Sequence, residues 1–413
     1  MTCTAETETP TRAAVSVGPA ILALAIGGFA IGTTEFVTMG LLPQIARGVH
    51  VSIPSAGHVI SAYALGVVVG APLIAALAAR LPRKGLLMGL MVAFVLGNLA
   101  ASLASGYGAL VAARFFSGLP HGAYFGVASL VAADLVPAGR RGRAVSRVML
   151  GLAVANVAGV PAATWMGQHL GWRSAYVAVA ALGALTVASV AVAVPRSARN
   201  PHATSRSELR AFTKAQVWLT LGAGAVGFGG MFAMYSYIAP TVLHVARLGE
   251  GYVPVYLLVF GTGMITGTAI GGRLADWSIL RTLVVAFAAM AVLLALFTQT
   301  AQWLVPGILT AYGIAVSTSV VAVVLQMRLM HVAGDAATIG AALNHSALNL
   351  ANALGAWLGG LVIAAGFGYT ATSWVGVALA AGGLVIMLVS VRLHLRRRAV
   401  PAAAEVDPSR LVA

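Results

Sequence analysis

Two ionisable side chains stand alone inside long apolar stretches of this sequence. Glu35 is the only acidic residue deep within such a stretch, and Arg114 is the only basic residue clearly within one. A charge at the centre of a membrane costs at least about 2.5 kcal/mol on insertion scales, so an intramembrane carboxyl is a functional candidate by default. Glu35 could take up and release protons, or it could be a structural group that hydrogen-bonds neighbouring helices.

Helix arithmetic places these two residues at a similar depth. Glu35 lies about 10 Å from the end of its stretch, and Arg114 lies about 9 Å from the start of its own, at 1.5 Å per residue. If the two stretches cross in opposite directions, a Glu35–Arg114 pair is predicted, in which a proton and Arg114 compete for the carboxylate. The alternative is a structural arginine that bonds only backbone carbonyls.

Histidine and asparagine side chains extend this set of candidates. His121 follows Pro120 and could relay protons, since histidine titrates near neutral pH, or it could be a hydrogen-bonded packing residue. His345, Asn349 and Asn352 share one helix face by their spacing of four and seven residues. Polar groups on one face of a span are expected to face a cavity or a partner helix. No His or Cys pair has the spacing of a metal site.

Tyr235 and Tyr237 precede Pro240 in another apolar stretch. Their hydroxyls could line a site for a small, partly polar ligand, or they could be aromatic residues at the membrane interface. Gly159 and Pro161 lie close together in an earlier stretch, where proline removes a backbone hydrogen bond, so a bend or a close helix contact is predicted there. A similar break is predicted in the stretch that holds Tyr235, Tyr237 and Pro240.

The elements that must position these residues are apolar helices. The chain of 413 residues is 60% hydrophobic and only 8% charged, whereas soluble domains carry about 25% charged residues. Spans of about 20 apolar residues are needed to cross a membrane. The predicted spans are 17–42, 56–79, 85–105, 108–135, 145–168, 173–194, 217–243, 253–275, 282–301, 303–330, 338–365 and 371–394.

The net charge of +15 has a topological explanation rather than a nucleic-acid one. Lysine and arginine collect in cytoplasmic loops of membrane proteins. With the N-terminus inside, the outer loops hold only Arg47, Arg173 and Arg247, so both termini are expected in the cytoplasm. Asp134 is expected to pair with the neighbouring cluster Arg140–Arg143.

The two sets of six spans repeat one another. Gly66 and Gly70 align with Gly263 and Gly267 at one offset (263 − 66 = 197 and 267 − 70 = 197), and Lys84 aligns with Arg281 at the same offset (281 − 84 = 197). Halves that repeat in parallel around a central site are a transporter design.

Together with these spans, several motifs make the chain resemble the major facilitator superfamily, in its drug:proton antiporter branch. More narrowly, it resembles the arabinose-efflux-permease-like and chloramphenicol-resistance-like exporters. The motifs are Gly32-Thr-Thr-Glu-Phe36, Gly40-Leu-Leu-Pro43, Arg114-Phe-Phe-Ser-Gly118-Leu-Pro-His121, Gly159-Val-Pro161, Gly171-Trp-Arg173, Tyr235-Ser-Tyr237-Ile-Ala-Pro240 and Asn349-Leu-Ala-Asn352. The resemblance implies efflux, because Gly159-Val-Pro161, in the fifth predicted span, matches the family motif that distinguishes exporters from importers. It also implies a role for Arg114 in proton transfer.

The sequence departs from the superfamily in the first inner loop. There the family pattern has an aspartate and a glycine, but this chain has Ala79 and Pro82 around the basic residues Arg80, Arg83 and Lys84. The second-half copy keeps the aspartate, as Asp276 in the motif that begins at Gly272. The conformational latch assigned to that aspartate is therefore expected to be weaker or different in the first half.

These observations predict an all-α integral membrane protein of two pseudo-symmetric six-helix bundles. The segments are a tail 1–16, a bundle 17–194, a linker 195–216, a bundle 217–394 and a tail 395–413. The expected function is proton-coupled export of a small molecule by a monomer in the bacterial inner membrane, with a proton gradient and no cofactor. A proton-independent facilitator or importer is the alternative. The sequence has no nucleotide-binding loop and no catalytic constellation, which argues against a membrane enzyme. It also has no large soluble loops, which argues against a receptor or scaffold.

Overall fold

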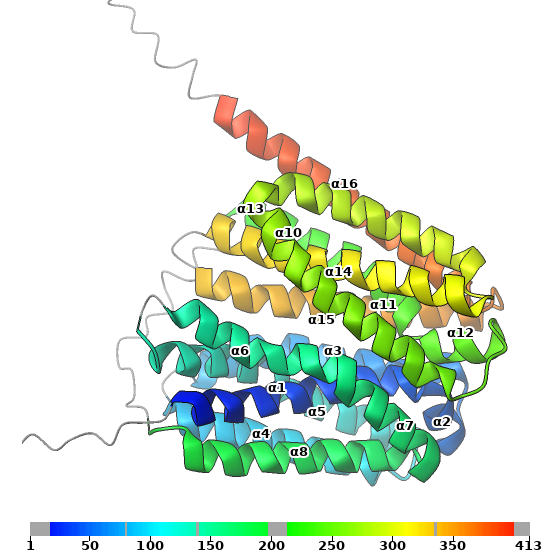
Figure 1. The fold of residues 1–413 in the computed structure, drawn as a ribbon, viewed down its shortest axis with the longest axis horizontal. Helices are drawn as coiled ribbons and strands as arrows, with labels where there is room; N and C mark the ends of the chain where they lie inside the picture. Colours follow the sequence, from blue (N-terminus) through cyan, green and yellow to red (C-terminus); the bar gives the residue numbers. More distant parts are fainter. Residues whose placement is uncertain (1–16, 79–80, 138–139, 197–212, 334–336, 400–413) are drawn as a thin grey trace, which may run out of the picture.

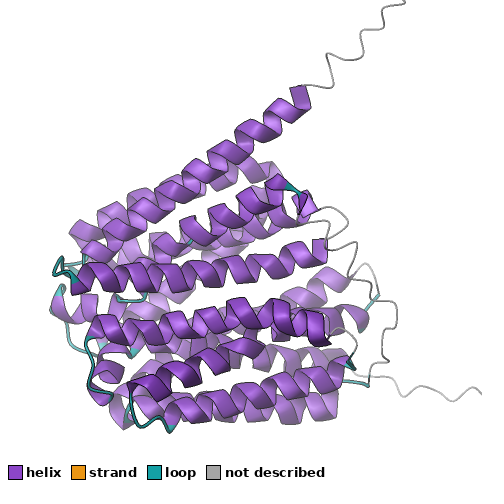
Figure 2. Cartoon of the chain, turned by 180° about the vertical axis from the view of Figure 1, so that it is seen from behind, coloured by secondary structure: helices purple, strands orange, loops and turns teal. Residues whose placement is uncertain are grey.

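The computed structural model describes residues 17–78, 81–137, 140–196, 213–333 and 337–399. Figure 2 shows this described part as helices joined by loops. The helices of the first half, which are labelled in Figure 1, are α1 (Val17–Gly40), α2 (Leu42–Gly48), α3 (Ile53–Ala78), α4 (Arg83–Ser102), α5 (Tyr107–Asp134), α6 (Arg141–Val154), η2 (Ala155–Gly159), α7 (Val160–Leu170) and α8 (Trp172–Ala193). Those of the second half are α10 (Ala215–Gly227), α11 (Gly229–Tyr235), α12 (Ile238–His244), α13 (Tyr252–Thr300), α14 (Leu304–Ala333), α15 (Ala337–Ala364) and α16 (Ala371–Ala399).

The described helices make twelve passes, as the sequence predicts. Ten helical stretches are long and apolar enough to cross a membrane. One of them, α13, has 49 residues and is interrupted at Ser278, whose backbone is extended (φ −169°, ψ 108°), so it makes two passes. The remaining pass is α5, which has 28 residues, packs against α3 and α4 and does not appear among the ten. The interruption at Ser278 falls between the predicted spans 253–275 and 282–301.

The two halves form two bundles that lie side by side (Figure 1). The end of the molecule at which α1 begins and α16 ends is called the terminal end below. The opposite end, where α2, α7 and α12 lie, is called the distal end. In Figure 1 the terminal end is on the left and the distal end on the right. Both bundles contribute residues to the contact between them, so side chains from each half can meet there.

The glycine repeat of the sequence has a structural counterpart. A Cβ atom at Gly66 or Gly70 would overlap the carbonyl oxygens of Phe115 and Leu119 on α5, and one at Gly263 or Gly267 would crowd those of Tyr312 and Val316 on α14. The partner residues are separated by the same offset as the glycines (312 − 115 = 197 and 316 − 119 = 197). Small residues allow backbones to approach closely in lipid. The same helix packing is therefore built twice.

Three of the predicted spans are subdivided in the structure. Span 17–42 ends at Gly40, and α2 follows it with Pro43 in its first turn. Span 145–168 contains the π-helix η2, which ends at Gly159 directly before Val160-Pro161. Since Pro161 has no N–H to donate, the regular hydrogen-bond ladder cannot continue through it, and a π-helix is one way to change the register. The predicted break near Tyr237 separates α11 from α12.

The basic connections at the terminal end correct one sequence prediction. Asp134 pairs with Arg83 and not with the Arg140–Arg143 cluster. Arg83 begins α4 and Asp134 ends α5, so the pair joins two neighbouring helix ends, whereas closeness in sequence favoured the wrong partner. Lys84 donates to the backbone oxygen of Ala191, which closes the end of α8. Ala79 and Arg80 lie outside the described residues, while Gly272 and Asp276 lie near the interruption of α13.

Candidate functional site

Glu35 is the only buried carboxyl group of the described chain. The other acidic residues in the described ranges are Asp134, Glu250 and Asp276, whereas only 7% of Glu35 is exposed. Glu35 lies within electrostatic reach of Arg114 on α5 and beside the side-chain amide of Asn352 on α15. Because α1 and α15 belong to different bundles, this carboxyl lies where the two halves meet.

The predicted Glu35–Arg114 ion pair does not form in the structure. Arg114, which is fully buried, donates from Nη1 to the hydroxyl of Thr34 at 2.9 Å and from Nη2 to the Thr34 carbonyl at 3.1 Å. The Thr34 hydroxyl in turn donates to Oδ1 of Asn98 on α4 at 2.6 Å. The depth estimate was correct to one residue, but neighbouring side chains on a helix point about 100° apart, so Thr34 and not Glu35 faces the guanidinium.

Aromatic rings hold the Arg114 guanidinium from its other sides. Its Cζ atom lies 4.1 Å from the ring centroid of Tyr63 and 5.3 Å from that of Tyr176. A cation over an aromatic ring is stabilised by the ring quadrupole, most strongly where water is excluded. Tyr63 also lies within electrostatic reach of Glu35. The ring of Tyr63 is therefore a shared neighbour of the buried acid and the buried base.

His121 is connected to this group through Tyr63. Nδ1 of His121 and the hydroxyl of Tyr63 are 3.0 Å apart and form a hydrogen bond in which the donor depends on the histidine tautomer. His345, on α15, stacks on Phe125 with ring centroids 5.9 Å apart and is close enough to His121 for their charges to interact. The structure thus brings the candidates Glu35, Arg114, His121 and His345 into one cluster.

The α15 face predicted from spacing carries unsatisfied polar atoms. Asn349 donates to the carbonyl of His345, one turn earlier, but its Oδ1 atom has no partner. Neither polar side-chain atom of Asn352 forms a hydrogen bond of regular geometry, although the amide lies within reach of the Glu35 carboxyl and only 1% of the residue is exposed. Buried polar atoms without partners are rare because they are costly, so each requires an explanation. A ligand that accepts and donates hydrogen bonds beside Glu35 would satisfy Asn352.

Tyr235 and Tyr237 lie on the distal side of this cluster. Tyr235 stacks on Phe260 with centroids 4.1 Å apart and meets the edge of Phe36 at 6.0 Å. Tyr237 donates from its hydroxyl to the carbonyl of Ala356. A Cβ at Gly57, on α3 of the first half, would overlap that hydroxyl, so Tyr237 occupies a notch that only glycine leaves open. Both tyrosines are buried and neither is an exposed interfacial residue.

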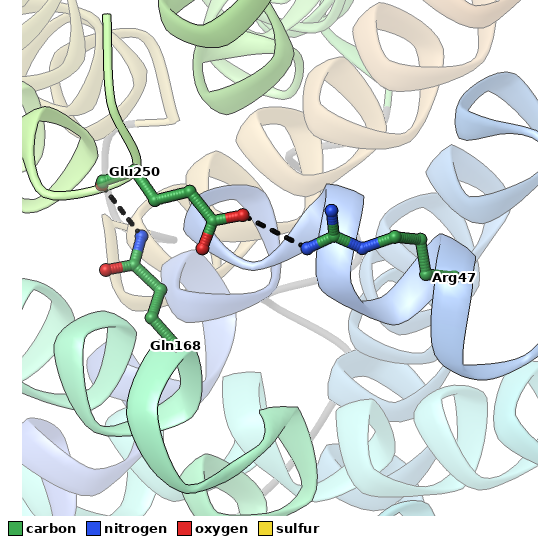
Figure 3. Close-up of polar contacts among 3 residues, drawn as sticks. All are labelled: Arg47, Gln168 and Glu250. Atoms are coloured by element: carbon green, nitrogen blue, oxygen red, sulfur yellow. Dashed lines mark hydrogen bonds and ion pairs between the residues drawn. The ribbon is translucent and has the colours of Figure 1, made fainter.

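The distal end is bridged by polar contacts, which Figure 3 shows. Arg47, in α2, donates to Oε1 of Glu250 at 3.1 Å, and Gln168, in α7, donates to the Glu250 backbone oxygen at 3.0 Å. Glu250 precedes α13 in the second half, so one short segment is tied to two helices of the first half. Ser61 on α3 also donates to the carbonyl of Ala353 on α15. The two bundles are thus joined at the distal end and again next to Asn352, which lies beside Glu35.

The residues of this site do not form a metal centre. Within the described ranges, no group of three His, Cys, Asp or Glu side chains is placed to hold a metal ion. The buried groups are instead one carboxyl, one guanidinium, hydroxyls, amides and imidazoles. Such a set can move protons and bind polar ligands between two helical bundles.

Comparison with known families identifies the architecture. A family profile described as Major Facilitator Superfamily matches residues 24–347, which include most of both bundles. The chain belongs to the Major Facilitator Superfamily. The superfamily profile covers Glu35, Arg114, His121 and His345 and stops shortly before Asn349.

Full-length relatives in the superfamily are bacterial transport proteins. The inner membrane transport protein YdhP of Escherichia coli is 41% identical over 374 residues, which are 90% of this chain and 96% of YdhP. The chloramphenicol resistance protein of Streptomyces lividans is 33% identical over 391 residues, 94% of this chain and 98% of the relative. The chain is therefore a membrane transport protein of the superfamily and not an enzyme, with relatives of the drug-efflux type.

A solved structure shows the same fold at low sequence identity. The crystal structure of a D-xylose–proton symporter superposes with a TM-score of 0.70 at 16% identity, and the match covers 90% of this chain and 97% of that one. At this identity the likeness establishes the superfamily fold alone.

Several residues of the site were not singled out from the sequence. Thr34 and Asn98 are polar residues inside apolar spans, and Thr34 lies in the motif around Glu35, so a search for buried polar residues would have found both. Tyr63 and Phe125 carry no such signal, because an aromatic residue in a span is most often a packing residue. Their position beside Arg114 and His345 emerges only from the fold.

Proposed function

We propose that this protein is a proton-coupled secondary transporter that exports a small molecule across the bacterial inner membrane by alternating access. In this proposal both termini are cytoplasmic, the distal end faces outward, and a monomer works on the proton gradient without a cofactor. The distribution of arginines supports the orientation, since the distal loops hold few of them. The relative YdhP, which is named as an inner membrane transport protein of Escherichia coli, supports the location.

The observation that carries the proposal is the burial of Glu35 between the bundles, beside Arg114 and the unpartnered amide of Asn352. A carboxyl of this kind can hold either a proton or a negative charge, and Arg114 favours the charged form when it is near. Intramembrane carboxyls of transporters commonly serve in proton relays. The hydrogen bond between Tyr63 and His121 extends the proposed proton path from Glu35 toward the terminal end.

Exchange follows if proton and substrate compete for the same buried groups, Glu35 and Asn352. A substrate whose polar group bonds Asn352 displaces the proton from Glu35, and a proton arriving from outside displaces the substrate. The described structure is then the state that is closed on the outside, with Arg47 bound to Glu250 and Tyr237 in the notch at Gly57. Opening the outer end requires both contacts to release.

The buried side chains around Glu35 favour a small neutral molecule with an aromatic or apolar part and several hydrogen-bonding groups. Phe36 stacks with Phe232 across the bundles, and Tyr235 with Phe260, while Asn349 and Asn352 provide free amide atoms. Amphenicol antibiotics have this character, as the name of the Streptomyces relative suggests, and sugars have the polar part of it.

A proton-independent facilitator or importer on the same fold is the second candidate. It is favoured by the bonding of Arg114 to Thr34 instead of Glu35, which is compatible with a static structural cation. In that case Glu35 would only hold α1 against α15, and flux would not respond to a proton gradient.

The test begins with the substrate. Strains expressing the protein are compared with empty-vector strains on a panel of amphenicols, other lipophilic antibiotics and sugars, and a compound that changes growth becomes the probe. Wild-type protein, Glu35→Gln and the control Glu250→Gln are then placed in liposomes with an imposed proton gradient. We expect the gradient to drive probe transport by the wild type and by Glu250→Gln but not by Glu35→Gln. A wild-type response in Glu35→Gln would refute the proton-carrier role, and no response in the wild type would favour the facilitator.

A further inference from the structure

Two adjoining hollows lie between α1 and α6 at the terminal end. One has a volume of about 520 Å³ and the other of about 340 Å³. They share Gly18, Ile21 and Arg147, so they form one continuous groove. Figure 1 shows α1 and α6 side by side, with their terminal ends adjacent. This groove is separate from the cluster around Glu35, which lies farther along α1.

The larger hollow has apolar walls that are exposed. Leu22 on α1 is 62% exposed, and Leu150 and Val154 on α6 are 55% and 42% exposed. Apolar side chains on the outer surface of a membrane-spanning helix contact lipid chains. At the floor of the groove the helices touch, because a Cβ at Gly151 would overlap the carbonyl of Ala25. The hollow is therefore an apolar slot that is open to lipid.

The smaller hollow is lined by three cations. Arg140, Arg143 and Arg147 face it, and Arg147 also lines the apolar slot. Among the described residues none of the three forms an ion pair, and Asp134, the nearest acidic residue in sequence, is bound to Arg83. Arg147 lies about 9 Å along α6 from its start, at 1.5 Å per residue. The positive charge is thus placed at the level where a span leaves the lipid.

We propose that this groove binds an anionic phospholipid from the leaflet at the terminal end. The phosphate would accept hydrogen bonds from the arginines, for which guanidinium is well suited, and one acyl chain would lie in the slot between α1 and α6. Charge complementarity selects an anionic headgroup, and the continuity of cationic and apolar surfaces selects a lipid over a free anion. A bound lipid would join α1, which carries Glu35, to α6, which continues into the π-helix η2.

The experiment measures lipid retention by the full-length protein with native mass spectrometry. Purified protein in detergent is mixed with phosphatidylglycerol or with phosphatidylcholine, and bound lipid is counted as a mass increment. The variants are Arg143→Gln/Arg147→Gln and Leu22→Trp, which fills the slot. Their matched controls are Arg273→Gln/Arg392→Gln, which removes two exposed arginines elsewhere at the terminal end, and Leu185→Trp on α8.

We expect the wild type and both controls to retain phosphatidylglycerol over phosphatidylcholine. The double arginine variant should bind phosphatidylglycerol more weakly by about fivefold for each arginine removed, the effect of one basic residue at an anionic surface. Leu22→Trp should lose retention while keeping all arginines, and added inorganic phosphate should not compete. Equal retention of the two lipids by the wild type, or undiminished retention in both groove variants, would overturn the proposal. If the double variant does not fold, Arg147→Gln alone and Leu22→Trp decide the outcome.

Discussion

Arg114 donates a hydrogen bond of 2.9 Å to the hydroxyl of Thr34, the residue directly before Glu35 in α1. The cation is therefore held next to the buried carboxyl but not on it. A small rotation of α1 would be enough to exchange one partner for the other. In the proposed cycle, the strength of the hydrogen bonds between Arg114 and Thr34 determines how readily Glu35 gains or loses its proton.

Replacing Thr34 with valine tests the hydrogen bond between Arg114 and the Thr34 hydroxyl. Thr34→Val keeps the shape of the side chain but removes the hydroxyl that accepts from Nη1 of Arg114 and donates to Asn98, while the Thr34 carbonyl still accepts from Nη2. A hydrogen bond to a charged group contributes about 1.5–3 kcal/mol, so the unfolding free energy should fall by about 2 kcal/mol. Gradient-driven flux should fall as well, because Nη1 of Arg114 loses its acceptor and can bind Glu35 instead. Thermal unfolding in detergent and transport in liposomes measure the two effects.

A matched substitution separates this effect from a general loss of packing. Thr186→Val also replaces a fully buried threonine, whose hydroxyl bonds only the carbonyl of Leu182 in its own helix. It should leave the pH dependence of flux unchanged. If the two valine variants behave alike in transport, Thr34 has no special relation to Glu35.

Tyr63→Phe removes a hydroxyl and keeps the ring. The ring under Arg114 should continue to stabilise the guanidinium, whereas Nδ1 of His121 loses its partner. We expect proton-coupled flux to fall severalfold and its pH profile to change, with stability lowered by only about 1 kcal/mol. Flux measured at several external pH values checks this. An unaltered pH profile would show that the Tyr63–His121 bond is not part of the proton path.

Gly57→Ala should disfavour closure of the distal end. The added methyl group would overlap the hydroxyl of Tyr237, which must leave its notch. Spin labels at Leu170 and Phe367, which are 71% and 72% exposed at the distal end of the two halves, report the separation between the bundles there. The mean separation should increase in Gly57→Ala and remain the same in Gly108→Ala, since nothing lies within 4 Å of a Cβ at Gly108. An unchanged separation in both variants would contradict the notch.

Glu250→Gln should have a small effect on the same measurement. The side chains of Arg47 and Glu250 are 67% and 41% exposed, and ion pairs of this kind contribute about 0.2–1 kcal/mol. The backbone bond from Gln168 to Glu250 also survives the change. The distal-open population should therefore rise by no more than about fivefold, the equivalent of 1 kcal/mol, and salt should have the same effect on the wild type. A complete opening would mean that this pair is the main latch.

Much of the fold follows from the sequence, for identifiable reasons. Apolar runs and the 197-residue repeat predict the passes and their duplicated packing, because lipid restricts spanning segments to helices and close helix contacts to small residues. The breaks at Pro161 and near Tyr237 follow from local chemistry in the same way. Even the interruption of α13 at Ser278 lies between two predicted spans.

The partners of the charged groups could not be predicted in this way. Residue spacing gives the depth of Arg114, but which side of α1 faces it depends on how the helices are rotated in the bundle. Asp134 is close in sequence to several arginines, yet its partner, Arg83, comes from a helix whose end happens to lie beside it. Proximity along the chain ranks partners poorly when several helix ends at one face carry cations.

The enclosure of Arg114 also has a consequence for how the protein is made. α5, which carries it, is not one of the ten stretches of the described chain that would be expected to cross the membrane by their own apolarity. Thr34 on α1, which hydrogen-bonds Arg114, Asn98 on α4, which bonds Thr34, and the ring of Tyr63 on α3 are synthesised before it, and the ring of Tyr176 on α8 comes later. When α5 leaves the translocon, its polar partners are already in the bilayer, so its insertion is coupled to that of the helices that precede it.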